Sequence, residues 1–222
     1  FINKYAQNFF LKDNSAVIHE YLAVFSHIIA FHDAELANHF ENIDFRPDLY
    51  AIPWFLTMFA HVFPLQKIFH LWDTLLLGSS HFPICIGVAI LKQLRNILLN
   101  SDFNECILLF SELPEINIIK CVSDSIEIFC STPTSCFYRQ HSQDEKSINN
   151  EKFGLGIDDE LNMEMSPIKL EQMKSELCPR ISTKDILTLY DIKLSKLILI
   201  DIRSILEFSQ ANIFNSKNIP FE

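Results

Sequence analysis

Glycine and basic clusters are both scarce in this sequence. Only four glycines occur among 222 residues, against a usual share of about 7%, so Gly-rich phosphate-binding loops and networks of tight hairpins are not expected. The pair Gly154 and Gly156 is too little to form a nucleotide-binding loop. Lysine and arginine number 18 against 28 acidic residues, which gives a net charge of −10 at pH 7. An acidic chain gains little from displacing phosphate counterions, which disfavours nucleic acid and anionic membrane surfaces as partners.

The motifs of metal sites and nucleophilic sites are also missing. The six cysteines form no C-x-x-C pair, which favours a reducing compartment in which most of the thiols are small core residues. No two of the eight histidines have the i, i+4 spacing around a glutamate that marks helical zinc sites. There is also no Gly-x-Ser-x-Gly motif and no Cys–His pair of catalytic type. The sequence therefore predicts no cofactor, no metal ion and no catalytic residue.

Long uncharged runs are present, and they raise the question of membrane insertion. Residues 49–66 and 74–91 contain no charged side chain. Each run holds proline and histidine, and the second also contains glycine and serine, so both are predicted to be helices of a protein core. No transmembrane segment is expected. An apolar share of 49% is ample for such a core.

The first 130 residues have the pattern of successive amphipathic helices. Apolar residues recur at intervals of three and four, and capping residues such as Asp33 and the pair Asp102 and Glu105 stand where segments begin. No alternating strand pattern interrupts them, so an all-α region is predicted. Besides the two helices of residues 52–73, the predicted helices cover residues 15–29, a short segment after Asp33, residues 83–99, a segment after Asp102 and residues 115–130. In the helix of residues 15–29, the spacing places Glu20 off the apolar face that Tyr21 and Phe25 share.

Residues 52–73 form the most informative stretch of the chain. Pro53 and Pro64 each stand where a first helical turn accepts proline, because the missing N–H is one that the helix does not use. The sequence therefore predicts two helices separated by a break before Pro64. After the break, the apolar residues follow the spacing of one buried helical face. These residues are Leu65, Ile68, Phe69, Trp72, Leu75 and Leu76.

Trp-Phe-Leu-Thr at 54–57 and Pro-Leu at 64–65, followed by Ile68, Trp72 and Asp73, make up a signature. It resembles the second half of TBC domains, the GTPase-activating domains for Rab GTPases. The resemblance implies that residues 1–140 are the C-terminal part of a helical TBC domain with a Rab-family GTPase as partner. It also implies a cytoplasmic protein that Rab proteins recruit to endomembranes. We interpret the matching residues as structural, with Asp73 pairing with or capping another element: Pro53, Trp54, Phe55, Pro64, Trp72 and Asp73.

The resemblance does not extend to the catalytic residues of the TBC family. These are an arginine and a glutamine in the motifs Ile-x-x-Asp-x-x-Arg and Tyr-x-Gln, which precede the region resembled here. Tyr5-Ala6-Gln7 matches the shorter motif but lacks its Gly-Met continuation, so we interpret Gln7 as an ordinary helix residue. Arg46 lies in Phe-Arg-Pro. Since the chain begins at Phe1 without a methionine, we expect a piece of a longer protein that is not catalytic by itself.

Residues 141–176 differ in composition from the segments on either side. Gln, Asn, Ser, Asp and Glu dominate, and Phe153 is the one aromatic residue. A segment that buries so little apolar surface cannot offset the entropy of being ordered. The sequence therefore predicts a flexible acidic linker here.

Residues 177–222 have a different pattern, with a helix, an apolar strand at 197–200, a second helix and a second strand near 216–220. The apolar run predicts that the first strand is covered on both faces. The stretch from 199 to 220 resembles the opening of a rhodanese-like domain, an α/β fold, although Ala211 and Asn212 stand where that family usually has Gly-His. The resemblance assigns structural roles to Asp201, Arg203, Glu207, Asn218 and Pro220.

Three functional interpretations follow from these patterns. The favoured one is a fragment of a Rab GTPase-activating protein or Rab-binding regulator of membrane traffic that lacks the catalytic motifs. The second is a non-catalytic scaffold built on TBC and rhodanese-like domains. The most distant is a rhodanese-type sulfurtransferase or a phosphatase-like enzyme, which the chain does not support because Cys178 precedes the fold and the sulfur-carrying cysteine of that family lies beyond Glu222.

Overall fold

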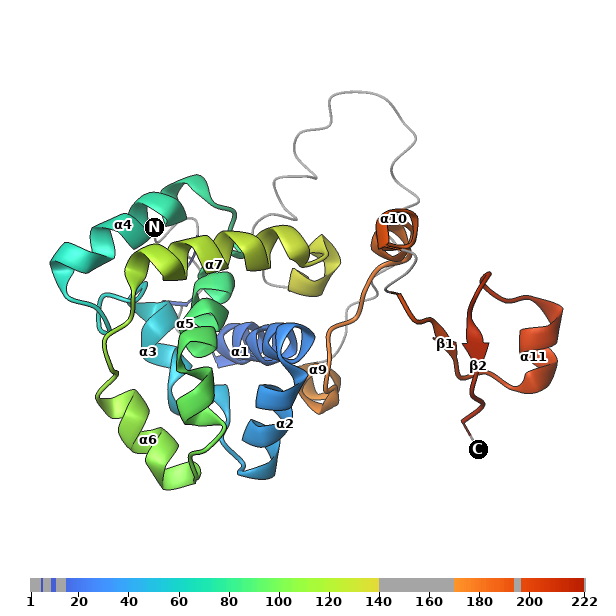
Figure 1. Cartoon of the computed structure of the whole chain (residues 1–222), viewed down its shortest axis with the longest axis horizontal. Helices are drawn as coiled ribbons and strands as arrows, with labels where there is room; N and C mark the ends of the chain where they lie inside the picture. Colours follow the sequence, from blue (N-terminus) through green and yellow to red (C-terminus); the bar gives the residue numbers. More distant parts are fainter. Residues whose placement is uncertain (1–4, 6–8, 11–14, 140–169, 194–196, 222) are drawn as a thin grey trace. The chain divides into compact units, whose positions relative to one another are not determined.

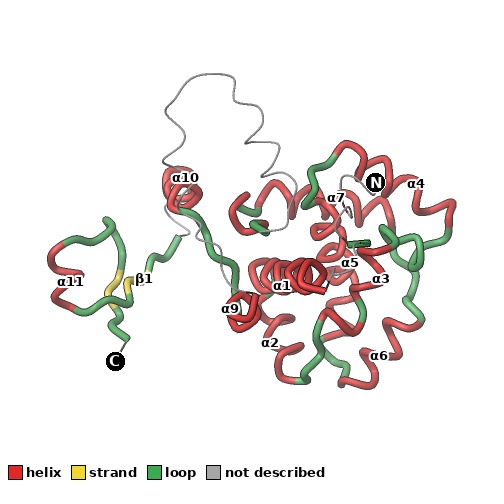
Figure 2. Tube along the Cα trace, turned by 180° about the vertical axis from the view of Figure 1, so that it is seen from behind, coloured by secondary structure: helices red, strands yellow, loops and turns green. Residues whose placement is uncertain are grey.

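The computed structural model describes residues 5, 9–10, 15–139, 170–193 and 197–221. By their contacts these residues fall into two units, Phe1–Ile181 and Ser182–Glu222. Helices dominate the first unit, as the red segments of Figure 2 show, and this confirms the predicted all-α region. Among the described residues, no helix is both long and apolar enough to cross a membrane.

The first unit follows the predicted order of helices (Figure 1). Capping explains several of the boundaries: Asp33 accepts the N–H of Leu36, and Asp102 and Glu105 form a reciprocal capping box. The last long helix begins three residues later than predicted, because Asn117 caps it by accepting the N–H of Lys120. The elements of the first unit are α1 (Ser15–His32), α2 (Ala34–Asn42), the 3₁₀ helix η2 (Pro47–Leu49), α3 (Ala51–Leu56), α4 (Leu65–Leu77), α5 (Phe82–Leu98), α6 (Phe103–Ser111), α7 (Ile118–Ser131), η3 (Thr134–Phe137) and α9 (Leu170–Ser175).

Helix α1 lies inside this unit, in contact with α2, α3, α5, α9, η2 and η3 (Figure 1). Its burial is therefore wider than the single apolar stripe that the sequence predicts. Tyr21 and Phe25 face the core as expected, but Glu20, which the spacing places off the apolar face, is also buried. The prediction for Glu20 was wrong because several neighbouring elements cover α1, whereas periodicity assumes one covered side.

Helix α4 is buried on a narrower arc than predicted. Ile68, Leu71 and Leu75 are fully buried. In contrast, Leu65, Phe69 and Leu76 are 61%, 51% and 59% exposed, so the expectation that they share the buried face was wrong. Helix α7 is a main neighbour of α4. A helix at the edge of a bundle is covered over part of its apolar surface, and the spacing of apolar residues does not reveal which part.

The structure also corrects the end of the predicted linker. The sequence extends the linker to Glu176, but residues 170–175 form α9, which packs on α1. Met173 is 6% exposed and belongs to the hydrophobic core. The Nε2 atom of His27 lies 3.1 Å from the carbonyl oxygen of Met173 and 2.9 Å from that of Glu176. This part of the linker prediction was wrong because the polar composition of the segment does not show that Met173 is buried or that His27 contacts its backbone. The rest of the predicted linker, residues 141–169, lies outside the described residues.

We expect the docking of α9 on α1 to weaken as the pH falls below about 6.5, the ordinary pKa of histidine. Burial lowers the pKa of His27, although the carbonyl contacts and Glu176 favour the charged ring. The folded state therefore holds the neutral ring, which donates through Nε2. Its stabilising contribution is complete above the unfolded pKa and is lost as the pH falls from there towards the folded pKa.

Hydrogen exchange of residues 170–176, corrected for intrinsic exchange rates, measures this effect at about pH 7.5 and about pH 5.5. The protection should be lower at the acidic pH. The variant His27→Gln retains a donor but does not titrate in this range, so its protection should change less between the two pH values. Equal losses in the two proteins would show that another group causes the pH dependence.

The second unit contains the predicted succession of helix, strand, helix and strand. Its elements are α10 (Thr183–Lys193), β1 (Ile200–Asp201), α11 (Ile205–Gln210) and β2 (Lys217–Asn218). The two strands pair in parallel, with Ile200 opposite Lys217 (yellow in Figure 2). Ile198 and Ile200 are exposed, so the prediction of a strand covered on both faces was wrong for the described residues. Burial on both faces of a parallel sheet requires helices packed against each face, and α11 does not bury these side chains.

Candidate functional site at the turn between α3 and α4

The signature residues lie on α3, on α4 and in the turn between them. Trp54 and Phe55 on α3 are each 2% exposed, whereas Pro53, one residue earlier, is half-buried. Pro64 is exposed and directly precedes α4 with an extended backbone, φ −57° and ψ 145°. The other two signature residues lie in the third turn of α4.

Trp72 and Asp73 have different environments on α4. The indole of Trp72 is half-buried and donates its Nε1–H to the carbonyl oxygen of Met58 at 2.9 Å. Asp73 is exposed and makes no hydrogen bond or ion pair with any residue that the structure describes. The expected pairing or capping by Asp73 is therefore not found among the described residues.

The turn after α3 has an unusual backbone. Met58 and Phe59 have positive φ angles of 47° and 65°, a region of backbone conformation that residues other than glycine rarely occupy. The Phe59 N–H donates to the Trp54 carbonyl at 2.8 Å, and the Thr57 N–H donates to the Pro53 carbonyl at 3.1 Å. These bonds satisfy carbonyls at the end of α3. Signature residues thus take part in the hydrogen bonds that end α3.

Two side chains of the signature hold this turn. The Thr57 hydroxyl donates to the Pro53 carbonyl at 2.7 Å and accepts the N–H of His61 at 3.2 Å. Trp72 reaches across from α4 to the carbonyl of Met58. Because left-handed backbone costs on the order of 1 kcal/mol per residue, it persists where surrounding contacts fix it. The turn therefore holds His61 and Val62 in one defined position.

An aromatic cluster supports the same region. The ring of Tyr50 stacks on that of Phe110 with centroids 4.2 Å apart, and Trp54 lies 5.3 Å from Tyr50 and 5.6 Å from Phe110. Burial raises the pKa of Tyr50, and its hydroxyl oxygen has no hydrogen-bond partner in the described part of the chain. The cluster forms one wall of the site, with rings from the η2–α3 segment and from α6.

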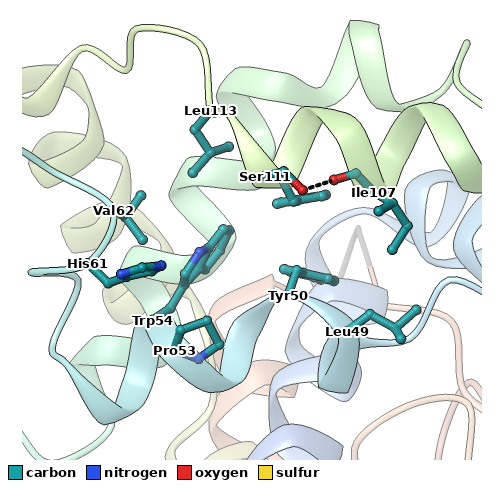
Figure 3. Close-up of a pocket in the computed structure, with 10 residues that line it drawn as sticks. Leu49, Tyr50, Pro53, Trp54, His61, Val62, Ile107, Ser111 and Leu113 are labelled. Atoms are coloured by element: carbon teal, nitrogen blue, oxygen red, sulfur yellow. Dashed lines mark hydrogen bonds between the residues drawn. The ribbon is translucent and has the colours of Figure 1, made fainter.

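A pocket of about 210 Å³ lies between this wall and the turn, as Figure 3 shows. Its walls come from η2 and α3 on one side, from the turn, and from α6 and the residues after it. The Ser111 hydroxyl at the rim donates to the Ile107 carbonyl at 2.8 Å (dashed in Figure 3). The lining residues are Leu49, Tyr50, Pro53, Trp54, His61, Val62, Ile107, Phe110, Ser111 and Leu113.

The sequence indicates one half of this pocket and not the other. Pro53 and Trp54 were singled out, whereas Ile107, Phe110 and Leu113 were not. They lie more than 50 residues further along the chain, so no local pattern joins them to Trp54. The aromatic residue on α6 was the available signal, although by itself it is indistinguishable from a core residue.

The described residues hold no cluster suited to a metal ion, and most of their cysteines are buried. No group of three or more His, Cys, Asp or Glu side chains is placed to hold a metal ion there. Of the six free cysteines, four are buried. Burial raises the pKa of the Cys106 thiol to about 11 and that of the Cys121 thiol to about 12, which makes them poor nucleophiles at neutral pH.

Asp201, Arg203 and Asn218, three residues of the predicted rhodanese-like segment, are joined by hydrogen bonds in the second unit. Asp201 accepts from the backbone N–H of Arg203 at 3.0 Å and from its Nη2 at 2.7 Å, and this pairing lowers the pKa of Asp201. Asn218 donates to the carbonyls of Asp201 and Arg203 at 3.0 and 2.9 Å. Glu207 forms a capping box with Ser204 at the start of α11. Pro220 is exposed after β2.

Comparison with known proteins gives one family match. Residues 1–99 match the model of the Rab-GTPase-TBC domain. The turn between α3 and α4, Trp54 and Trp72 lie inside this match. The pocket wall contributed by α6 lies beyond residue 99.

Several curated proteins are similar to the chain over all or about half of its length. The chain is 53% identical to the TBC domain-containing protein kinase-like protein of Homo sapiens, over 100% of the chain and 28% of the relative. It is 34% identical to the protein of the same name in Dictyostelium discoideum, over 99% of the chain and 20% of the relative. The GTPase activating protein Gyp51 of Schizosaccharomyces pombe is 33% identical over 48% of the chain and 10% of its own length. The chain thus spans less than a third of the length of these relatives.

Proposed function

We propose that this chain, whose residues 1–99 match the Rab-GTPase-TBC domain, is part of a Rab GTPase-activating protein or of a Rab-binding regulator of membrane traffic. The observation that carries the proposal is this match, together with 53% identity over the whole chain to a TBC domain-containing relative. A relative named as a GTPase activating protein adds support. On this proposal, residues 1–140 supply the C-terminal part of the TBC domain.

The state of the arginines favours a supporting role over a catalytic one. A GTPase activator supplies an arginine side chain to the transition state in the bound GTPase. Such a side chain must be free of contacts within its own protein in order to reach the GTPase. Four of the five arginines make close contacts within their own unit: Arg95 with Asp33 and Glu35, Arg139 over the ring of Tyr21 at 4.4 Å, Arg180 with Glu176, and Arg203 with Asp201. Arg46 is the most loosely held, 3.7 Å from Asp44 and 3.9 Å from Asp48. We therefore propose that this part of the protein does not deliver the catalytic arginine or glutamine.

For residues 177–222 we propose the beginning of a rhodanese-like module that serves in protein interactions. Its support is the group formed by Asp201, Arg203 and Asn218 at the end of β1 and at β2. A sulfurtransferase is disfavoured because Cys178 is exposed and lies before the second unit begins at Ser182. A scaffold without activator function stays the main alternative. For the whole protein we propose a cytoplasmic location with recruitment to endomembranes through Rab proteins.

Direct binding to Rab proteins tests the proposed function. The 222-residue chain is immobilised, and purified Rab proteins loaded with a non-hydrolysable GTP analogue or with GDP are passed over it. We expect at least one Rab protein to bind in the GTP form in preference to the GDP form. A small GTPase from outside the Rab family is the control. No binding by any Rab, or equal binding by the control GTPase, would contradict the proposal in favour of a scaffold with other partners.

A further inference from the structure

We propose that the outer side of α4 binds the same surface of a second copy of this chain, with the two helices antiparallel, so that the chain forms a two-fold symmetric dimer. This inference does not depend on binding to Rab proteins. It rests on an exposed apolar stripe, on the scarcity of charge around it and on the residues at its flank. Helix α4 lies at the outer edge of the first unit in both Figure 1 and Figure 2.

Helix α4 carries an apolar stripe on this outer side. Four apolar residues follow one side of the helix over about three turns: Leu65, Phe69, Trp72 and Leu76. Leu65, Phe69 and Leu76 are 61%, 51% and 59% exposed, and Trp72 is half-buried. The Trp72 ring is fixed by its bond to the Met58 carbonyl and lies 6.3 Å from the Phe69 ring, measured between centroids. A row of large apolar side chains along a helix is the pattern that packs against another helix.

The chain around the stripe carries very little charge. Lys67 and Asp73 are the only charged residues between positions 49 and 91, and their charges cancel. Helical spacing places Lys67 on the opposite side of α4 from the stripe, and its Nζ atom lies 2.6 Å from a carboxylate oxygen of Glu115. The net charge of −10 therefore comes from other parts of the chain. Since the centres of protein interfaces are depleted in charge, this neutral surface fits a second copy of itself better than a strongly charged partner.

The spacing of the stripe is compatible with antiparallel pairing to itself. Its intervals of four, three and four residues are the same in both directions along the helix. In an antiparallel pair, Leu65 therefore meets Leu76 of the second copy, and Phe69 meets Trp72. Such a two-fold contact uses one surface patch on both subunits and closes on itself.

The flank of the stripe favours the antiparallel direction. Gln66 and Asp73 are exposed and lie on the same flank, two helical turns apart. Antiparallel pairing brings this flank against the same flank of the second copy, so that the Gln66 amide can donate to Asp73. Parallel pairing would instead place Asp73 against the other flank, which holds the buried Ile68 and Leu75 and offers no side-chain donor. A carboxylate without a donor is costly at an interface.

Sedimentation equilibrium of the 222-residue chain tests the proposal. Because one helix per subunit covers less than the roughly 800 Å² per partner of a standard interface, the dimer should be weak, and the measurement runs from about 1 µM to about 1 mM. A reductant keeps the exposed Cys130 and Cys178 as thiols. We expect a reversible equilibrium between monomer and dimer. A chain that stays monomeric over the whole range would overturn the proposal.

Salt and aspartate variants locate the contact on α4. Raising the salt concentration to about 0.5 M should strengthen the dimer, because it screens the repulsion between two acidic chains; a dimer that salt dissociates would contradict an apolar contact. Phe69→Asp and Leu76→Asp should each weaken association at least about tenfold, with circular dichroism to verify the fold. Ile119→Asp on α7 and Phe221→Asp in the second unit are matched controls at apolar positions that are 81% and 88% exposed. An equal loss in either control would place the contact elsewhere and overturn the proposal.

The substitution Gln66→Lys tests the direction of the pairing. In the antiparallel dimer the new ammonium group lies beside Asp73 of the second copy, and two-fold symmetry forms this pair twice. Association should therefore strengthen about two- to tenfold, the range of two exposed ion pairs. The double variant with Gln66→Lys and Asp73→Asn should lose this gain, although its net charge is smaller and its chains repel each other less. If Gln66→Lys gives no gain, or if the double variant keeps it, the antiparallel arrangement is wrong.

Discussion

The 222-residue chain is expected to leave the rate of GTP hydrolysis by Rab proteins unchanged in a single-turnover assay. Supplying an arginine to the transition state accelerates hydrolysis by about 10³–10⁵-fold, so its absence removes most of the effect of an activator. The arginines of the described residues form ion pairs or, for Arg139, lie buried against Tyr21. Phosphate release from GTP-loaded Rab proteins, with and without excess chain, is the measurement.

The variant Arg46→Ala provides the control for this expectation, because Arg46 is the most exposed arginine and has the longest ion-pair distances. Its phosphate release should match that of the unchanged chain. A strong acceleration by the chain that disappears in Arg46→Ala would show that the chain does carry an arginine finger. Loss of the acceleration on mutation of Gln7, which lies outside the described residues, would instead show that the Tyr-x-Gln motif is functional.

Replacing Trp54 with alanine is expected to lower the free energy of unfolding of the first unit by about 3–5 kcal/mol, the usual cost of truncating a buried aromatic side chain. Trp54 is 2% exposed, and its ring lies within 5.6 Å of the Tyr50 and Phe110 rings, measured between centroids. Removing it leaves a cavity that these rings cannot fill without moving. Urea unfolding followed by far-ultraviolet circular dichroism measures the change.

Two variants serve as controls for the loss at Trp54. Trp72→Phe keeps a ring on half-buried α4 surface but removes the donor to Met58, so it should cost about 1–2 kcal/mol. Leu108→Ala, at an exposed position of α6, should change stability by less than about 0.5 kcal/mol. A larger loss for Trp72→Phe than for Trp54→Ala would mean that the hydrogen bond to the turn, and not the aromatic cluster, dominates the stability of this region.

Local features of the fold follow directly from the sequence. The capping box of Asp102 and Glu105, the cap at Asp33 and the box of Ser204 and Glu207 each connect residues three apart. Such contacts depend on few neighbours, so sequence spacing is enough to predict them. The order of helices in residues 15–131 and the order of elements in the second unit are predictable for the same reason.

The candidate site also has features that the sequence predicts and features that it does not. The sequence places Trp54 and Trp72 in a signature, but it does not show that the Trp72 indole reaches Met58 or that Met58 and Phe59 adopt left-handed backbone. It also does not bring Phe110 to Trp54. These relations join residues that are distant along the chain or depend on how a turn is closed.

The sequence by itself thus determined the helical class, the helix starts capped by Asp33 and Asp102, and the resemblance to the TBC family. The tertiary structure alone decided which arc of α4 is buried, that Glu20 is covered, and that α9 returns to α1 through Met173 and His27. It also decided that Trp54 forms the floor of a pocket. The physical reason is that helical periodicity and capping arise from interactions over a few residues, whereas burial depends on which distant elements cover a surface, and apolar spacing is compatible with more than one such arrangement.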